Sequence, residues 1–431
     1  MYLNVVDGVW MNSQFDYMKS CAGVSYSTAV SSEPMYPKTL LALTLYLLVS
    51  AGRVYALFPK FSLVAIPWGE ISGILLITVF ILEFTAKGRG NYSFSYADWC
   101  VLGLVILGAM GIPFSVWEGG SFKSWINFLK VALLFFGTSF AVRQFADLLR
   151  LFRVLAFCII LTVMAAFNAG ISHSTLYLGM MYDPNDVALI MVIGMPVLFY
   201  LSFLASGIKK LFYLVLSILC SVVIILSGSR GALLGLISFP LYGIFTWPRA
   251  RVKIIGIGFL GVVLYFTMAP AASLERFSTI WSPQTEYDRS YGNRTEIWKR
   301  GLTTIATKPI FGAGMGNFAV ADGSLKGEGA WQTAHNSLIQ LGGEMGIPAL
   351  LTFMYLVSGT FWKLRQKRQT TYLQEIDTVQ VGALRALEFS LVSFMVCGLF
   401  LSQAYLSYLY FILGLSQAAL RIDTKEEMEC L

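Results

Sequence analysis

Charged residues are scarce in this chain of 431 residues: Asp, Glu, Lys and Arg make up 13% of it, whereas 56% is apolar. Soluble globular chains carry about 25% charged residues. Apolar stretches of roughly 20 residues, the length of one helical crossing of a bilayer, recur along nearly the whole sequence. The composition therefore excludes a soluble enzyme, a secreted disulfide scaffold and a disordered protein. It predicts a membrane protein.

Cysteine and histidine are also rare. The six cysteines form no C-x-x-C pair, and four of them lie inside apolar stretches, which excludes a disulfide framework and a zinc knuckle. The two histidines, His173 and His335, have no acidic cluster beside them. We therefore expect no metal site and no cofactor, although magnesium held by carboxylates alone stays open. The first apolar run follows a polar tail, residues 1–37, so no cleavable signal peptide of the usual layout is expected.

The apolar runs predict an all-α polytopic membrane protein with about twelve transmembrane helices. The spans are expected near 39–57, 62–82, 99–117, 125–142, 151–169, 187–205, 211–228, 231–247, 254–270, 337–362, 386–402 and 405–420. The chain then divides into the polar tail 1–37, nine helices in 38–270, a long hydrophilic loop at 271–336, three helices in 337–420 and a tail at 421–431.

The basic residues predict the orientation in the bilayer, because Lys and Arg are retained on the cytoplasmic side. If both termini are cytoplasmic, fourteen basic residues fall in the inner links: Lys87, Arg89, Arg143, Arg150, Arg153, Lys209, Lys210, Arg249, Arg251, Lys253, Lys363, Arg365, Lys367 and Arg368. Four fall in the outer links, namely Arg53, Lys60, Lys123 and Arg230. The net charge of +7 therefore orients the chain and does not indicate a nucleic-acid partner.

The long loop 271–336 is expected on the outer face, and loops of this length in compact proteins are usually functional. Within it, Asn293 to Glu296 has the spacing of a helix start, and Ile297, Gly301 and Ile305 share one face. The pattern ends at Lys308-Pro309. We expect an amphipathic helix on the outer surface, followed by the glycine-rich turn 312–316.

Arg230 is the first candidate for chemistry. It stands in the sequence Ser227-Gly228-Ser229-Arg230, where the chain turns straight back into the membrane. A new helix start exposes N–H groups and a positive dipole end, and Ser229 or Ser227 can cap it. With a guanidinium added, the turn suits a phosphate group. The structural alternative is an arginine that extends to the lipid headgroups.

Arg294 and His335 are the other principal candidates. Arg294 occupies the first turn of the loop helix, where a positive charge opposes the helix dipole; this hints at a partner, although a pair with Glu296 explains it equally well. His335 precedes the tenth span and has the side chain of a general base near neutral pH, although a structural histidine is the commoner case. Glu344 can pair with His335 only if the helix starts after His335.

For some of the further candidates, a structural role is an alternative to a functional one. Asp183 and Pro184 read first as the cap and first residue of the sixth span, and substrate contact by Asp183 or Asn185 comes second. Lys130 lies inside the fourth span and could add a third positive charge beneath the outer loop. The full set of candidate substrate contacts beyond Arg230, Arg294 and His335 is Lys130, Asp183, Asn185, Ser229, Asn336 and Glu344.

Three stretches together resemble a known family. They are SGSRGALLGL at 227–236, RTEIWKRGLTTIATKPIFGAGMGNF at 294–318 and AHNSLIQLGGEMGIPAL at 334–350, and DPND at 183–186 also fits. The chain resembles the O-antigen ligase and O-antigen polymerase superfamily of bacterial envelope glycosyltransferases, in the order of its spans as well. The resemblance implies a GT-C-like helical fold in the bacterial inner membrane.

The same resemblance implies a reaction. A glycan carried on undecaprenyl diphosphate would be transferred, on the periplasmic face, to a hydroxyl of lipid A core, of a growing polysaccharide or of a protein. Arg230 and Arg294 would hold the diphosphate, and His335 would activate the acceptor hydroxyl. An O-antigen ligase is the leading reading. A polymerase or a protein O-oligosaccharyltransferase of the same superfamily is the close alternative, and a lipid-linked sugar flippase or secondary transporter is the alternative of another class.

Overall fold

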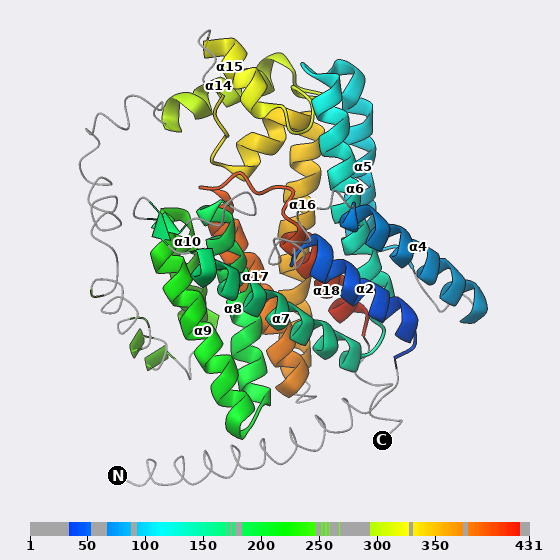
Figure 1. Ribbon diagram of the computed structural model, residues 1–431, viewed down its shortest axis with the longest axis vertical. Coiled ribbons are helices and arrows are strands. Elements are labelled where there is room, and N and C mark those ends of the chain that lie inside the picture. Colours follow the sequence, from blue (N-terminus) through cyan, green and yellow to red (C-terminus); the bar gives the residue numbers. More distant parts are fainter. Residues whose placement is uncertain are drawn as a thin grey trace.

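The structure is a computed structural model of the chain (Figure 1). It describes residues 34–52, 67–87, 93–169, 171–172, 175–176, 183–246, 294–326, 331–373 and 378–422, together with a few residues between 251 and 267.

The described residues are almost entirely helical. In chain order the elements are α2 (Pro37–Ser50), α4 (Trp68–Lys87), α5 (Tyr96–Gly111), the 3₁₀ turn η2 (Ile112–Phe114), α6 (Glu118–Ala141), α7 (Phe145–Ala169), β1 (Ile171–Ser172), β2 (Thr175–Leu176), α8 (Pro184–Leu204), α9 (Gly207–Ser227), α10 (Arg230–Thr246), α14 (Arg294–Thr307), α15 (Phe318–Lys326), α16 (Ser337–Leu373), α17 (Thr378–Gly398) and α18 (Ser407–Arg421). The two strands, of two residues each, form an antiparallel pair.

Eight of the described helices are long and apolar enough to cross a membrane, and α2 and α10 are shorter apolar helices. The expected fold class, an all-α polytopic membrane protein, is therefore confirmed. Eleven of the twelve predicted spans coincide with described helices, and the span near 254–270 lies almost wholly outside the described residues.

Three helix starts, those of α6, α7 and α17, were predicted several residues too late. Helix α7 begins at Phe145, not near 151. Helix α6 begins at Glu118, not near 125, because its first turn is polar and small rather than apolar. Helix α17 begins at Thr378, not near 386, because Gln380 and Arg385 interrupt the apolar run before 386.

Further along, α17 carries the charged residue Glu388. That carboxylate is satisfied inside the bundle: Arg368 of α16 donates from Nε at 2.5 Å, and the Tyr242 hydroxyl of α10 donates to it as well. A buried charge is tolerated when it is paired in this way, and hydropathy alone does not show the pairing.

Helix α8 is the buried centre of the bundle. Its residues from Val187 to Leu198 are apolar on every side, and all of them are buried. A helix that is apolar all round requires neighbours on all sides. Helices α7, α9, α10 and α17 supply them, as Figure 1 shows. The start of α8 is thereby fixed among other helix ends.

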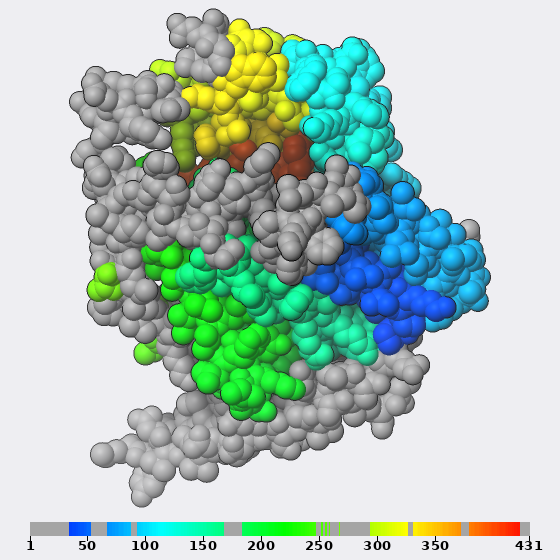
Figure 2. All heavy atoms as spheres, in the orientation of Figure 1, coloured from blue at the N-terminus to red at the C-terminus, as the bar shows by residue number. Residues whose placement is uncertain are grey.

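We call the end of the bundle where α8, α10, α16 and α18 begin the loop end. Helices α14 and α15 lie there, beside the tips of α5 and α6 (Figures 1 and 2).

At the opposite end of the bundle, side-chain hydrogen bonds join other helices. Arg421 of α18 donates to Asp98 of α5 at 2.5 Å. The ammonium of Lys367 binds three carbonyls at the last turn of α18, where a positive charge is favoured by the helix dipole.

A kink in α16 attaches the loop layer to the bundle. Gly346 has φ +80, and Pro348 lacks an N–H, so the carbonyls of Gly343 and Glu344 lose their helical partners. The glycine-rich turn supplies new ones. Ala313 N donates to Gly343 O at 2.7 Å, and Gly314 N donates to Glu344 O at 2.9 Å. The predicted turn 312–316 thus docks directly on the broken helix.

Candidate active site at the helix starts of the loop end

Arg230 is the first residue of α10, directly after the tight turn that ends α9. Gly228 has φ +64 and makes the reversal, and the Ser229 hydroxyl accepts from Ala232 N at 3.3 Å. Ser229 is therefore the cap of α10, as its position predicted. Arg230 is half-buried and belongs to the first turn of α10, the positive end of that helix.

The next residue brings α10 against the turn between α17 and α18. A Cβ atom on Gly231 would lie 3.0 Å from Cβ of Phe400, a tight contact that a larger residue could make only if Phe400 shifted. We call residues Leu399–Leu406 the α17–α18 turn. Gly231, the residue after Arg230, contacts this turn.

His335 lies immediately before α16 and is held by its neighbours. Asn336 caps the helix: its Oδ1 accepts from Leu338 N at 2.9 Å and from Ile339 N at 3.0 Å, while its amide donates to Leu399 O at 3.1 Å. The Ser337 hydroxyl donates to Leu401 O at 2.6 Å. Both bonds end on the α17–α18 turn, so the start of α16 and the start of α10 flank the same short segment.

The backbone of His335 is strained. Its φ of +48 makes it the one non-glycine residue with positive φ in the described part of the chain. Such a conformation costs about 1–3 kcal/mol and persists only where the surroundings impose it. The half-buried imidazole has the Thr333 hydroxyl 3.4 Å from Nε2. The strain is consistent with a side chain directed by function rather than by local preference.

Helix α14 attaches beside His335. The Trp298 indole donates to Ala334 O at 3.0 Å, and Ala334 is the residue before His335. Gly301 packs on Ile339 of α16, where an added Cβ would come within 2.5 Å of its side chain. The predicted helix over the loop is confirmed, with its Ile297 and Gly301 face buried. Arg294 begins this helix, one turn before Trp298.

Loss of the Trp298 indole donor should loosen α14. We expect Trp298→Phe to cost about 1 kcal/mol, the net value of one hydrogen bond, and to raise local opening of α14 about fivefold. Hydrogen exchange of the α14 amides in detergent measures this. The control is Trp331→Phe at a side chain that is 63% exposed. Equal exchange rates in the two variants would show that the indole bond does not hold α14.

The charges of Arg294 and Asp183 both act on His335. Burial lowers the pKa of His335 below its usual 6.5, the positive charge of Arg294 lowers it further, and the carboxylate of Asp183 opposes both. Residues from α8, α14 and the segment before α16 thus act on one imidazole. The depressed pKa keeps that imidazole neutral near pH 7, the form that accepts a proton.

Asp183 and Asn185 form the start of α8. The Asp183 carboxylate accepts from Asn185 N at 2.7 Å and from the Asn185 amide at 2.8 Å, which confirms Asp183 as the predicted cap. Asp186, in the same turn, accepts a bond from the Gln403 amide of the α17–α18 turn. The start of α8 therefore joins the starts of α10 and α16 at this turn.

Glu344 and Lys130 have other partners. Glu344 is buried on α16, where its carboxylate accepts from Gly316 N at 2.9 Å and from the Tyr405 hydroxyl at 2.8 Å; it fixes the glycine-rich turn rather than pairing with His335. The Lys130 ammonium lies 2.8 Å from Glu70 of α4. Lys130 is therefore part of the α4–α6 contact, and its contribution of a third positive charge to the site stays a prediction.

Trp298, Gln403 and Tyr405 were not found from the sequence. Each acts through a contact with a distant segment, and no motif or spacing signals it. His173 lies outside the described residues. Among the described residues, no group of three or more His, Cys, Asp or Glu side chains could hold a metal ion.

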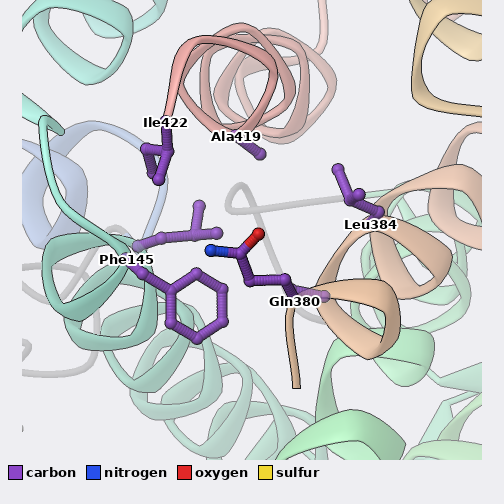
Figure 3. Close-up of a pocket in the computed structure, with 7 residues that line it drawn as sticks. Phe145, Gln380, Leu384, Ala419 and Ile422 are labelled. Atoms are coloured by element: carbon purple, nitrogen blue, oxygen red, sulfur yellow. The ribbon is translucent and has the colours of Figure 1, made fainter. Parts of the chain in front are cut away.

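A small pocket lies elsewhere, between the starts of α7 and α17 and the end of α18, around Phe145, Gln380 and Ile422 (Figure 3). Helix α18 is about 22 Å long at 1.5 Å per residue, so this pocket is remote from the α17–α18 turn that precedes its first residue. It does not belong to the site described above.

A comparison with protein families finds one match. Residues 215–354, about a third of the chain, match the family model described as O-antigen ligase. The segment is similar to the O-antigen ligase family. It runs from α9 through α14 to α16 and contains Arg230, Arg294 and His335. No curated protein matches the chain.

The recognised superfamily, O-antigen ligase and O-antigen polymerase, is thus confirmed by this match. In general terms the O-antigen ligase domain implies a membrane glycosyltransferase that acts on lipid-linked glycans and polysaccharides. The arrangement suits that chemistry: two guanidinium groups and a helix start can bind an anion, and a neutral imidazole can accept a proton.

Proposed function

We propose that this protein transfers a glycan from undecaprenyl diphosphate to an acceptor hydroxyl on the periplasmic face of the bacterial inner membrane, most simply as an O-antigen ligase with lipid A core as acceptor. The observation that supports the proposal is the meeting of the helix starts next to Arg230, Arg294 and His335: Gly231 and Asn336 both contact the α17–α18 turn, and Trp298 of α14 bonds to Ala334. Both termini would be cytoplasmic and the loop end would face the periplasm, in accord with the positive-inside distribution.

In the proposed reaction, the acceptor oxygen attacks the anomeric carbon of the first sugar. The bond from that carbon to the diphosphate oxygen breaks, and undecaprenyl diphosphate leaves with the electron pair. Arg230 and Arg294 stabilise the negative charge that grows on the leaving group, together with the positive end of α10. His335 takes the proton from the acceptor hydroxyl. The donor bond supplies the energy, so no nucleotide is needed.

The remaining candidates would shape the same site or contact the acceptor. Ser229 and Asn336 are engaged as helix caps, so their contribution is to shape the starts of α10 and α16. Asp183 and Asn185 stand at the start of α8, where they can contact the acceptor sugar. Glu344 would hold the glycine-rich turn above the site.

The direct test is transfer by the purified protein. It is incubated with a defined undecaprenyl-diphosphate oligosaccharide and with competing lipid A core and glycan acceptors, and the products are identified by mass spectrometry. A glycan joined to lipid A core supports a ligase, and extension of the glycan itself supports a polymerase. Movement of labelled donor between leaflets without any glycosidic bond would reject the proposal in favour of transport. Single displacement predicts inversion at the anomeric carbon.

The pH dependence of kcat/KM provides a further prediction. Because His335 must be neutral to accept a proton, activity falls on the acid side as the imidazole is protonated. Its pKa is lowered by burial and by Arg294, so the acid limb should have its midpoint below pH 6.5. Asp183→Asn keeps a good cap but removes the charge that raises the pKa, and it should move the midpoint to still lower pH. An acid limb that stays in place in this variant would separate Asp183 from His335.

A further inference from the structure

The α17–α18 turn does more than connect two helices. It accepts bonds from Asn336 and Ser337 and packs against Gly231, as described above. It also binds α16 further along, since the Tyr405 hydroxyl donates to Glu344 at 2.8 Å. One of its side chains reaches in the other direction, away from α16 and toward α8. That side chain is Gln403.

Gln403 makes two bonds to two different helix starts. Its backbone N–H donates to the Ser337 hydroxyl at 3.0 Å, and its side-chain amide donates to the carboxylate of Asp186. Ser337 lies two residues after His335, and Asp186 lies three residues after Asp183. A hydrogen bond to a carboxylate is roughly twice as strong as one between neutral groups. Through these two hydrogen bonds, Gln403 links the segment that contains Asp183 to the segment that contains His335.

We propose that Gln403 is a positioning residue: through its bonds to Asp186 and Ser337 it holds the start of α8, and with it Asp183, beside His335. The inference rests on the proposed function, in which His335 accepts the proton of the acceptor. Two charged groups act on His335 from the elements around it, Arg294 of α14 and Asp183 of α8. Of these, Asp183 favours the imidazolium that forms during proton transfer, so its distance from His335 matters to the reaction.

The consequence for catalysis is geometric. A misplacement of about 1 Å at a reacting group can cost on the order of 10²-fold in rate. Release of α8 from the turn would let Asp183 drift from the imidazole without removing any group that touches substrate. Gln403→Met keeps the size of the side chain and removes its donor. We expect it to lower kcat roughly 10- to 100-fold and to change the donor KM far less.

The experiment reads the proton affinity of His335 without using turnover. Diethyl pyrocarbonate modifies only neutral imidazole, so the rate of modification of the His335 peptide against pH, followed by mass spectrometry, gives that affinity. In Gln403→Met the proton affinity should weaken at least about twofold, because the nearby carboxylate that favours the protonated form is lost. The double exchange Gln403→Glu with Asp186→Asn reverses donor and acceptor and should restore both the affinity and kcat.

The controls separate positioning from folding. Ser402→Ala alters the neighbouring residue, whose buried hydroxyl has no hydrogen-bond partner among the described residues, and it should behave as the wild type. Adding Gln403→Met to Asp186→Ala should have no further effect. If the proton affinity of His335 is unchanged in a folded Gln403→Met protein, the inference is wrong. If instead the wild type forms no glycosidic bond, the proposed function fails, while the modification profile still decides whether Gln403 positions Asp183.

Discussion

Replacement of His335 with asparagine should stop glycan transfer and leave the protein folded in the membrane. A positioned general base contributes roughly 10²- to 10⁴-fold, and loss of the imidazole removes that contribution because an amide cannot take the proton of a hydroxyl. Asparagine is the right replacement here. The residue adopts φ +48, a conformation that asparagine tolerates and that alanine adopts only with strain of about 1–2 kcal/mol.

The measurement is single-turnover transfer from a defined lipid-linked donor, so that the chemical step is observed. The chain offers a matched control, because its other histidine, His173, can be exchanged for asparagine in the same way. We expect transfer to survive in His173→Asn and to fall at least about 100-fold in His335→Asn. Wild-type turnover in His335→Asn would remove the residue from the mechanism and leave its strained backbone without a catalytic explanation.

Much of the fold follows from physical properties that a sequence displays directly. Apolar runs of membrane length give the helices, and caps such as Asp183 and Ser229 give several of their starts. The starts of α6 and α17 were misplaced because polar residues interrupt the apolar run near each start: Lys123 in α6, and Gln380 and Arg385 in α17. Inside α17, Glu388 shows how a buried charge is accommodated, since its Arg368 and Tyr242 partners come from α16 and α10.

The principal candidate residues could also be located from sequence, because each stands at the beginning of a helix or beside one. Arg230 follows a Ser-Gly-Ser turn, Arg294 begins an amphipathic helix, and His335 precedes a span. Sequence could not show what joins them. The bonds of Trp298 to Ala334 and of Gln403 to Asp186 link residues 36 and 217 positions apart, and only the packed bundle brings them together.

The same limit explains the two secondary candidates whose environments differ from expectation. A lysine and a glutamate inside apolar spans both suggest function, but their chemistry depends on the nearest opposite group. Lys130 meets Glu70 of α4. Glu344 meets two backbone N–H groups of the loop and the Tyr405 hydroxyl, because the kink at Gly346 folds the glycine-rich turn onto it. Neither partner can be inferred from spacing along one helix.

Arg230→Ala should lower kcat by about 10²- to 10³-fold, the typical effect of removing one group that stabilises charge in a transition state. The physical reason is the leaving group. Its charge increases as the bond to the anomeric carbon breaks, so a guanidinium beside it gains more in the transition state than in the bound substrate. Loss of Arg230 should therefore act on kcat more than on donor binding, which equilibrium binding of a non-hydrolysable donor analogue measures separately.

Arginine and lysine should differ at this position. Arg230→Lys keeps the charge but not the planar fork that matches two phosphate oxygens, so it should restore transfer only in part, and Arg294→Lys should behave alike. The control is Arg365→Ala, at the opposite end of α16 from His335. Full activity in both lysine variants would mean that these arginines supply only a positive field. Equal losses of kcat in Arg230→Ala and Arg365→Ala would mean that the effect of Arg230 comes from the stability of the bundle and not from contact with the diphosphate.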